Sequence, residues 1–299
     1  MSDRYHATVP RRLAVELIDP AGSSLGEGPA WDAAADCLVW VDILGQKVHL
    51  SEADGTRRAT KEFDRHVGAA LPAEDGGYLV VRRDGFARWH ANDEITPLLD
   101  VLTDGSLRFN DAKCDPAGRA FAGTLCYTDG VRGRGELFRL DAGPKATPVR
   151  GPVSLANGLG WSPDGRLMYF IDTVEGTLTE FDYDVDGGVL TAPRVLVNFD
   201  GSAGQPDGMC VDDDGCLWVA LWGGAAVHRF TPDGRLDTVL EVPSKNVTSC
   251  AFGPGGRLYV TTAAGALSPE ERAQWPLAGG LFVAEPGAGG PAAVPWRPL

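Results

Sequence analysis

Six segments of the chain share one pattern of hydrophobic and polar positions. Each has an apolar run, a turn rich in Asp and Gly, a second apolar run, and then a polar hairpin with a third run. The apolar runs, such as "LWVAL" from Leu217, are rich in β-branched and aromatic residues, which favour strands over helices. The segments begin, 40 to 50 residues apart, at Trp31, Leu71, Cys114, Trp161, Val211 and Phe252.

Turn-forming residues separate the apolar runs. In Pro163-Asp164-Gly165 the proline presets φ, and the glycine accepts the positive φ that a tight turn needs. Asp75-Gly76 and Asp214-Gly215 repeat this device. Helical periodicity is convincing only at residues 268–275, where Ser268 is expected to cap a short helix that begins at Pro269.

A repeat of 40 to 50 residues with about four short strands is typical of a β-propeller blade. The sequence therefore predicts an all-β fold, a six-bladed β-propeller. A β-sandwich is the alternative, but it does not require a similar motif at this spacing. Because closing a ring takes strands from both chain ends, the segment Leu13–Ile18 is expected to complete the blade that begins at Phe252. Residues 1–12 are predicted to form an N-terminal tail, and residues 13–299 a single propeller domain.

One position of the repeat, four residues before each start, carries most of the candidate chemistry. Equal phase in a rotationally repeating fold means equal radius and height, so these six side chains are predicted to form a ring at one mouth of the central channel. Four of them are Asp, Glu or Asn, and none is His or Cys, which suits a hard cation such as Ca²⁺, Mg²⁺ or Mn²⁺. Turn formation alone would explain Asp and Asn, but Glu is a poor turn former. The ring positions are Glu27, Val67, Asn110, Asn157, Asp207 and Thr248.

Several residues near the ring have two interpretations. Strand alternation places Arg108 on the same side as Asn110, so its guanidinium is expected either to enter the cavity or to pair with a surface carboxylate. By the same alternation Asp111 should face away from Asn110. His66 is expected to be structural or solvent-facing rather than part of the channel. Trp218 and Trp222 are expected to lie in the blade core rather than to form a substrate platform.

The net charge argues against two classes of partner, and the N-terminal stretch and the cysteines indicate the compartment. The net charge of −14 opposes binding to nucleic acid or to an anionic membrane surface. The N-terminal stretch has no apolar core of a signal peptide and no run long enough to span a membrane, so a cytoplasmic location is expected. The six cysteines form no C-x-x-C pair and are expected to be buried, reduced thiols.

One catalytic motif matches in sequence but not in its expected secondary structure. Residues 22–26, "GSSLG", match the G-x-S-x-G pattern of the serine hydrolase nucleophile elbow. That motif needs a helix after the serine. Here Gly28-Pro29 and a strand pattern follow Ser24, so a serine hydrolase is not expected.

Four ordered motifs carry a family resemblance. "LGEGPAWD", "RFNDAKCDPAGRAFAGT", "ANGLGWSPDG" and "QPDGMCVDDDGCLWVALWGG" resemble the regucalcin/gluconolactonase (senescence marker protein-like) family of six-bladed propellers. The segment "LSPEERAQWPLAGGLF" is similar to the sugar-lactonase branch, which includes bacterial xylonolactonases and arabinonolactonases. The resemblance runs from about residue 25 to residue 282.

The resemblance implies a function and a set of roles. It implies a divalent cation, with Ca²⁺ favoured and Zn²⁺, Mn²⁺, Fe²⁺ or Mg²⁺ as alternatives, held by Glu27, Asn157 and Asp207. It also implies that Arg108 binds a small sugar lactone, that Asn110 contacts this substrate or a metal-bound water, and that Asp207 is the general base. The expected reaction is hydrolysis of an aldonolactone, a pentono- or hexonolactone, to the aldonic acid. The family has acidic residues after the "GT" motif, where this chain has Cys126-Tyr127-Thr128, so the sugar is left open.

Two other functions fit the same ring. A Lewis-acidic cation at this position would also serve an organophosphate or phosphotriester hydrolase. A non-enzymatic calcium-binding or protein-interaction propeller is the third possibility. A purely structural ion would have no need of Arg108 and Asn110 beside the ring, which favours an enzyme. The sequence makes no prediction of the oligomeric state.

Overall fold

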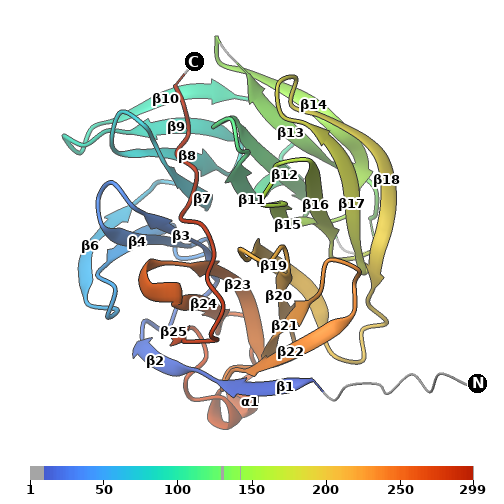
Figure 1. The fold of residues 1–299 in the computed structure, drawn as a ribbon. Coiled ribbons are helices and arrows are strands. Elements are labelled where there is room, and N and C mark those ends of the chain that lie inside the picture. Colours follow the sequence, from blue (N-terminus) through green and yellow to red (C-terminus); the bar gives the residue numbers. More distant parts are fainter. Residues whose placement is uncertain (1–9, 129–130, 142, 299) are drawn as a thin grey trace, which may run out of the picture.

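The computed structural model describes residues 10–128, 131–141 and 143–298 of the chain. Six sheets in these residues stand around a common centre (Figure 1). From the centre outward, the first is β3 (Gly26–Asp32), β4 (Cys37–Asp42), β5 (Lys47–Ser51) and β6 (Arg57–Glu62). The second is β7 (Val67–Pro72), β8 (Tyr78–Arg82), β9 (Gly85–Trp89) and β10 (Ile95–Asp100). The third is β11 (Leu107–Cys114), β12 (Ala120–Cys126), β13 (Gly135–Asp141) and β14 (Lys145–Val153).

The remaining three blades follow the same order. The fourth is β15 (Ala156–Trp161), β16 (Leu167–Asp172), β17 (Thr177–Asp184) and β18 (Val189–Asn198). The fifth is β19 (Gln205–Val211), β20 (Leu217–Trp222), β21 (Ala226–Phe230), β22 (Leu236–Glu241) and β1 (Arg11–Ala14). The sixth is β23 (Asn246–Phe252), β24 (Leu258–Ala263), β25 (Leu281–Ala284) and β2 (Glu16–Asp19). The predicted six-bladed β-propeller is confirmed.

The innermost strands surround the channel. Each contacts the next, from β3 through β7, β11, β15 and β19 to β23, and β23 contacts β3. The hydrophobic core is accordingly divided into six clusters, one between each pair of neighbouring blades. Trp218 is buried in the cluster between the fifth and sixth blades, as predicted, whereas Trp222, at the end of β20, is only partly buried.

The N-terminal segment serves two blades. β2 pairs with β25 and is the outermost strand of the sixth blade, while β1 pairs in parallel with β22 of the fifth. The segment expected to be one strand, Leu13–Ile18, is therefore divided at Val15 between neighbouring blades. β1 begins at Arg11, so the predicted end of the tail at residue 12 is two residues too late. Residues 1–9 of the predicted tail lie outside the described residues.

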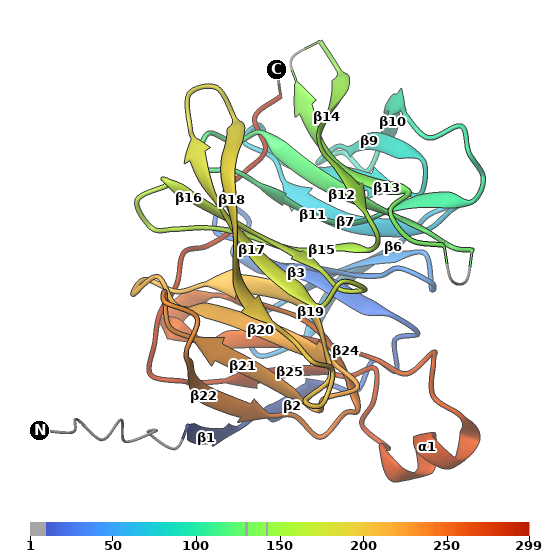
Figure 2. The same cartoon turned by 90° about the vertical axis from the view of Figure 1, so that its right-hand side faces the viewer.

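The expected short helix is confirmed, and the expected burial of the cysteines holds for five of the six. The short helix α1 (Pro269–Gln274) lies outside the sheets (Figure 2), and the Ser268 hydroxyl accepts a hydrogen bond from Glu271 N–H at its N-terminus. A 3₁₀ turn, η1 (Pro254–Gly256), precedes β24. All six cysteines are free thiols, five of them buried, and Cys126 is half-buried.

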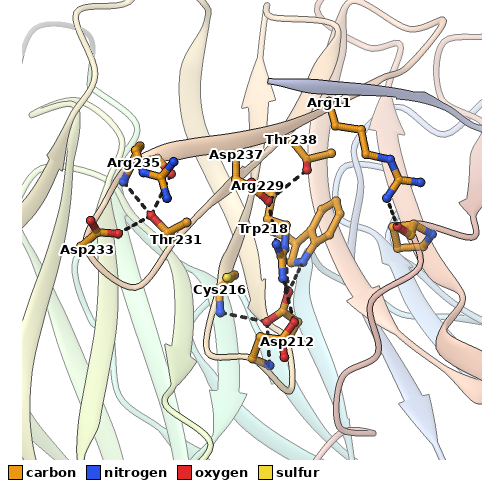
Figure 3. Close-up of polar contacts among 12 residues, drawn as sticks. Arg11, Asp212, Cys216, Trp218, Arg229, Thr231, Asp233, Arg235, Asp237 and Thr238 are labelled. Atoms are coloured by element: carbon orange, nitrogen blue, oxygen red, sulfur yellow. Dashed lines mark hydrogen bonds and ion pairs between the residues drawn. The ribbon is translucent and has the colours of Figure 1, made fainter. Parts of the chain in front are cut away.

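Buried aspartates organise the turns at the far end of the blades, as Figure 3 shows for the fifth. Asp212 follows β19, and its carboxylate accepts hydrogen bonds from the N–H groups of Asp214 and Cys216 in the turn. It also accepts hydrogen bonds from Trp218 Nε1 at 3.0 Å and from Arg229 Nε at 2.8 Å. In the third blade Asp115 takes the same role with the N–H groups of residues 117 and 119.

The C-terminal segment closes this far end of the channel. Residues 285–298 cross the propeller from the sixth blade to the second and third (Figure 1, red). On this path Ala293 N–H donates to Trp31 O, and Trp296 N–H donates to Pro72 O. Trp296 is buried in the core between the second and third blades, which fixes the segment.

His49 makes the stability of the first blade depend on pH. Its ring packs 4.4 Å from that of Trp40, and burial together with the Arg57 charge lowers its pKa from 6.5 to about 4. Between these values the unfolded chain binds a proton that the folded chain does not, so stability is present above about pH 6.5 and falls as the pH drops toward 4. Urea unfolding at pH 7 and pH 5 should show a smaller loss of stability in His49→Gln than in the wild type. Equal losses in the two proteins would contradict this role.

Candidate functional site

The six ring positions lie on the six innermost strands, near their first residues. All six side chains are buried: Glu27 on β3, Val67 on β7, Asn110 on β11, Asn157 on β15, Asp207 on β19 and Thr248 on β23. The four oxygen-bearing side chains therefore occupy equivalent places at one mouth of the channel, as the repeat phase predicts.

A β-bulge at each ring position sets the direction of these side chains. In every innermost strand the pairing register shifts beside the ring residue, for example between Phe109 and Ala112 in β11 and between Pro206 and Met209 in β19. A bulge bends a strand and interrupts strict alternation. Consecutive residues at the bulge can thus both face the channel.

Glycine after the ring residue lets neighbouring blades approach. A Cβ atom on Gly68 would lie 2.1 Å from the carbonyl oxygen of Asn110, and one on Gly158 would lie 2.7 Å from that of Asp207. Only glycine fits at such contacts without moving the backbone. These two glycines therefore set the separation of the ring residues on adjacent strands.

The third and sixth blades depart from this rule, since Asp111 and Ser249 follow their ring residues, and one expectation fails in the third blade. The residue after Asn110 is Asp111, which the alternation argument turns away from the ring. In the structure it lines the channel, because the bulge breaks the alternation. Asp111 borders a cavity of about 320 Å³ below the ring, together with Lys113, whose Nζ donates to Met209 O at 2.7 Å.

A chain of hydrogen bonds links three of the predicted site residues. Arg108 Nη1 donates to Asn110 Oδ1 at 2.6 Å, as expected from their spacing. Asn110 Nδ2 donates to Asn157 Oδ1 at 3.1 Å, and Asn157 Nδ2 donates to Thr173 Oγ1 at 2.9 Å. Thr173 in turn donates to the carbonyl of Pro206, next to Asp207. Asn157 Oδ1 thus faces Asn110, the ring residue of the neighbouring blade.

Two aspartates hold the loops that lead into the ring. The Asp42 carboxylate accepts hydrogen bonds from the N–H groups of Ser24 and Leu25, just before Glu27. Asp172 accepts those of Ser154 and Leu155, at the equivalent place before Asn157. Each carboxylate caps the segment that carries a ring residue, so the ring is built on rigid elements.

The electrostatics of the ring are unfavourable for the bare carboxylates. Burial and the nearby charge of Asp111 raise the pKa of Glu27 to about 8. Burial and the charges of Glu27 and Asp111 raise the pKa of Asp207 well above its usual range. Burial also lowers the pKa of Arg108. Like charges withdrawn from water at one place repel each other strongly.

The donor set fits a hard divalent cation. Glu27 and Asp207 supply two carboxylates, and Asn157 Oδ1 supplies a neutral oxygen. A cation between the carboxylates would offset their repulsion and desolvation. Among the described residues no group of three or more His, Cys, Asp or Glu side chains is arranged to hold a metal, and the predicted set contains only two such side chains.

The comparisons with known proteins decide the family. The family model described as "SMP-30/Gluconolactonase/LRE-like region" matches residues 25–264, about four-fifths of the chain. The chain belongs to this family. The resemblance deduced from the four sequence motifs is thereby confirmed.

Similar members of the SMP-30/gluconolactonase family are named for lactone hydrolysis or calcium binding. A Bacillus subtilis protein named as a sugar lactone lactonase, YvrE, is 38% identical over 91% of this chain and 94% of its own length. The 6-deoxy-6-sulfogluconolactonase of Pseudomonas putida is 36% identical over 87% of this chain and 90% of its own. A solved structure of regucalcin from Agrobacterium tumefaciens, described as a calcium-binding protein, superposes with a TM-score of 0.90 at 28% identity, over 97% of this chain and all of that one.

The mouth of the channel above the ring contains the side chain of Tyr127, which the sequence analysis did not identify as part of the site. Tyr127, in the loop after β12, lies with its ring 5.6 Å from the guanidinium carbon of Arg108 and 6.0 Å from that of Arg83. His66 Nδ1 is 2.8 Å from Tyr127 Oη, so this histidine, expected to be structural or solvent-facing, belongs to the mouth. The only sequence signal was the departure at residues 126–128 from the family pattern.

The serine-hydrolase motif can be compared with its structural context. β3 begins at Gly26, the last residue of the "GSSLG" segment, so a strand and not a helix follows Ser24, and the serine-hydrolase motif lacks its structural context. Among the described residues no helix is long and apolar enough to cross a membrane.

Proposed function

We propose that this chain hydrolyses an aldonolactone to its aldonic acid, with one divalent cation held by Glu27, Asn157 and Asp207. One observation carries the proposal. Two buried carboxylates and an amide oxygen share the mouth of the channel with Arg108, a buried guanidinium whose Nε has no hydrogen-bond partner. Relatives named as lactonases, which are hydrolases of cyclic esters, support the reaction class.

The roles follow from the contacts. When bound, the cation would act as a Lewis acid toward the lactone carbonyl. Asp207 accepts a proton from the attacking water, because its carboxylate is buried at the ring, beside the place proposed for the cation. Arg108, whose Nε has no hydrogen-bond partner within the described residues, offers this N–H to the sugar oxygens. Asn110 binds the substrate and fixes Asn157, since its amide bridges Arg108 and Asn157.

The cation that we propose is Ca²⁺. The ring offers only oxygen ligands, which calcium prefers. The description of the Agrobacterium regucalcin as a calcium-binding protein supports the same ion. Zn²⁺, Mn²⁺, Fe²⁺ and Mg²⁺ are the alternatives, because oxygen sites discriminate weakly among divalent ions.

The test is acid release from xylono-, arabinono-, glucono- and galactonolactone by metal-stripped protein before and after each ion is added. Turnover of at least one lactone should return with a divalent ion. The same ion should raise the unfolding temperature of the stripped protein, because it binds only the folded state. Glu27→Gln should lose both effects.

Three other outcomes would contradict the proposal in different ways. Turnover of an organophosphate ester without any lactone turnover would indicate a phosphotriesterase. An ion that raises the unfolding temperature without supporting any turnover would indicate a calcium-binding propeller. Full lactone turnover by the stripped protein would remove the cation from the reaction.

A further inference from the structure

We propose that the mouth of this site selects a lactone with an anionic group, such as a carboxylate or phosphate, at the end remote from the lactone carbonyl. Arg83 would bind that group. The inference rests on the proposed lactonase function and names its substrate class. It comes from the two arginines around Tyr127, Arg83 and Arg108, of which the ring chemistry leaves Arg83 unused.

Arg83 has the properties of a binding residue. It is half-buried at the end of β8, and its Nη2 donates to the carbonyl of Gly105. No carboxylate lies within ion-pair distance of its guanidinium in the part of the chain that the structure describes. The other donors of this planar fork are free for a ligand, and such a fork matches a carboxylate or phosphate.

Other arginines at the same rim are neutralised. Arg65 Nη1 lies 2.9 Å from Asp84, and Arg134 Nη2 lies 2.5 Å from Asp104. Acidic residues outnumber Lys and Arg by 41 to 27 in this chain, so an unpaired arginine is unexpected on grounds of charge alone. Arg83 and Arg108 both lack an acidic partner at contact distance within the described residues, and both lie against the ring of Tyr127.

Within the described residues, the two guanidinium groups without an acidic partner create a positive potential at the mouth. Two cations near one ring repel each other, and an anion between or beside them offsets that cost. The two positive charges of a divalent cation bound by Glu27 and Asp207 would balance the negative charges of these two carboxylates. Asp111 has Lys113 as its main charged neighbour, so it does not neutralise the mouth. Positive charge therefore remains for the substrate.

The positions of the two arginines orient the lactone. Arg108 is buried and contacts the ring residue Asn110, so the reacting end lies on its side. Arg83 is half-buried and contacts the loop at Gly105, so the anionic end points toward β8. Tyr127 lies against both guanidinium groups, and its hydroxyl is hydrogen-bonded to His66, which holds the ring in place.

The experiment compares kcat/KM for glucono-1,5-lactone with that for its 6-phosphorylated form and for a glucaric acid lactone, which carries a carboxylate. The wild type should prefer at least one anionic lactone by about 10-fold or more, the worth of one charge-assisted contact. Arg83→Gln should lower this ratio about 10-fold, while Arg83→Lys should retain part of it. The ion-paired Arg134→Gln is the matched control and should leave the ratio unchanged.

The outcomes separate this inference from the lactonase proposal. A wild-type ratio near one, or a preference that Arg83→Gln leaves intact, would overturn the inference while lactone turnover still stood. If no lactone is hydrolysed, the proposed function fails, and binding of 6-phosphogluconate and gluconate by calorimetry decides the inference alone. Equal affinities, or a difference that Arg83→Gln leaves unchanged, would then overturn it.

Discussion

Replacing Asp207 with Asn is expected to lower metal-dependent lactone hydrolysis by about 10³-fold or more. The change removes the general base, which alone contributes roughly 10²- to 10⁴-fold, and weakens the cation site by one charged ligand. Initial rates with the best lactone, at saturating concentrations of the activating ion, measure the loss. Equilibrium dialysis of the same ion measures the change in affinity.

The loss should not come from unfolding. Asp207 is buried near Glu27, so removing its charge relieves repulsion in the metal-free protein. The unfolding temperature of the metal-free variant should therefore equal or exceed that of the metal-free wild type. Asp200→Asn is the control, since Asp200 is exposed in the loop before β19 and accepts hydrogen bonds from Ser202 N–H and Oγ. Wild-type rates in Asp207→Asn would remove it from both proposed roles.

Replacing Asp212 with Ala is expected to destabilise the fold by about 3–5 kcal/mol, the usual cost of breaking a buried ion pair. Its carboxylate is 1% exposed and accepts two turn N–H groups, the Trp218 indole and the Arg229 guanidinium (Figure 3). Without it these donors lose a partner in a dry interior. Urea unfolding of both proteins at pH 7 measures the difference.

Asp233→Ala is the matched control for Asp212. Asp233 lies in the turn between β21 and β22, where its carboxylate accepts the Thr231 hydroxyl in solvent-exposed surroundings (Figure 3). Its removal should cost less than about 1 kcal/mol. A loss in Asp212→Ala as small as in this control would show that Arg229 finds sufficient partners in Asp214 and Asp237.

The candidate site was predictable where it depended on the repeat. Glu27, Asn110, Asn157 and Asp207 were found because equal phase in six similar segments places them at equal height on the innermost strands. The contact of Arg108 with Asn110 followed from their spacing of two. Asp111 was misplaced because alternation assumes a regular strand, and the bulge in β11 is not visible in the residue pattern.

The mouth could not be predicted in the same way. Arg83 follows β8, and His66 and Tyr127 lie on other loops, so no spacing or shared phase connects them. They meet because the second and third blades stand side by side around the channel. Loops outside the repeat carry no common pattern, and their contacts depend on packing between segments far apart in the sequence.

The sequence by itself determined the class of fold, the number of blades and the ring of oxygen-bearing side chains. These follow from local physics: alternating apolar runs make strands, Asp-Gly turns reverse them, and repetition multiplies each position six times. Only the tertiary structure decided that Val15 separates two strands in different blades, that Asp111 faces the channel, and that Arg83 joins Arg108 at Tyr127. Each of these depends on register shifts or on contacts between distant segments, which no local pattern of residues encodes.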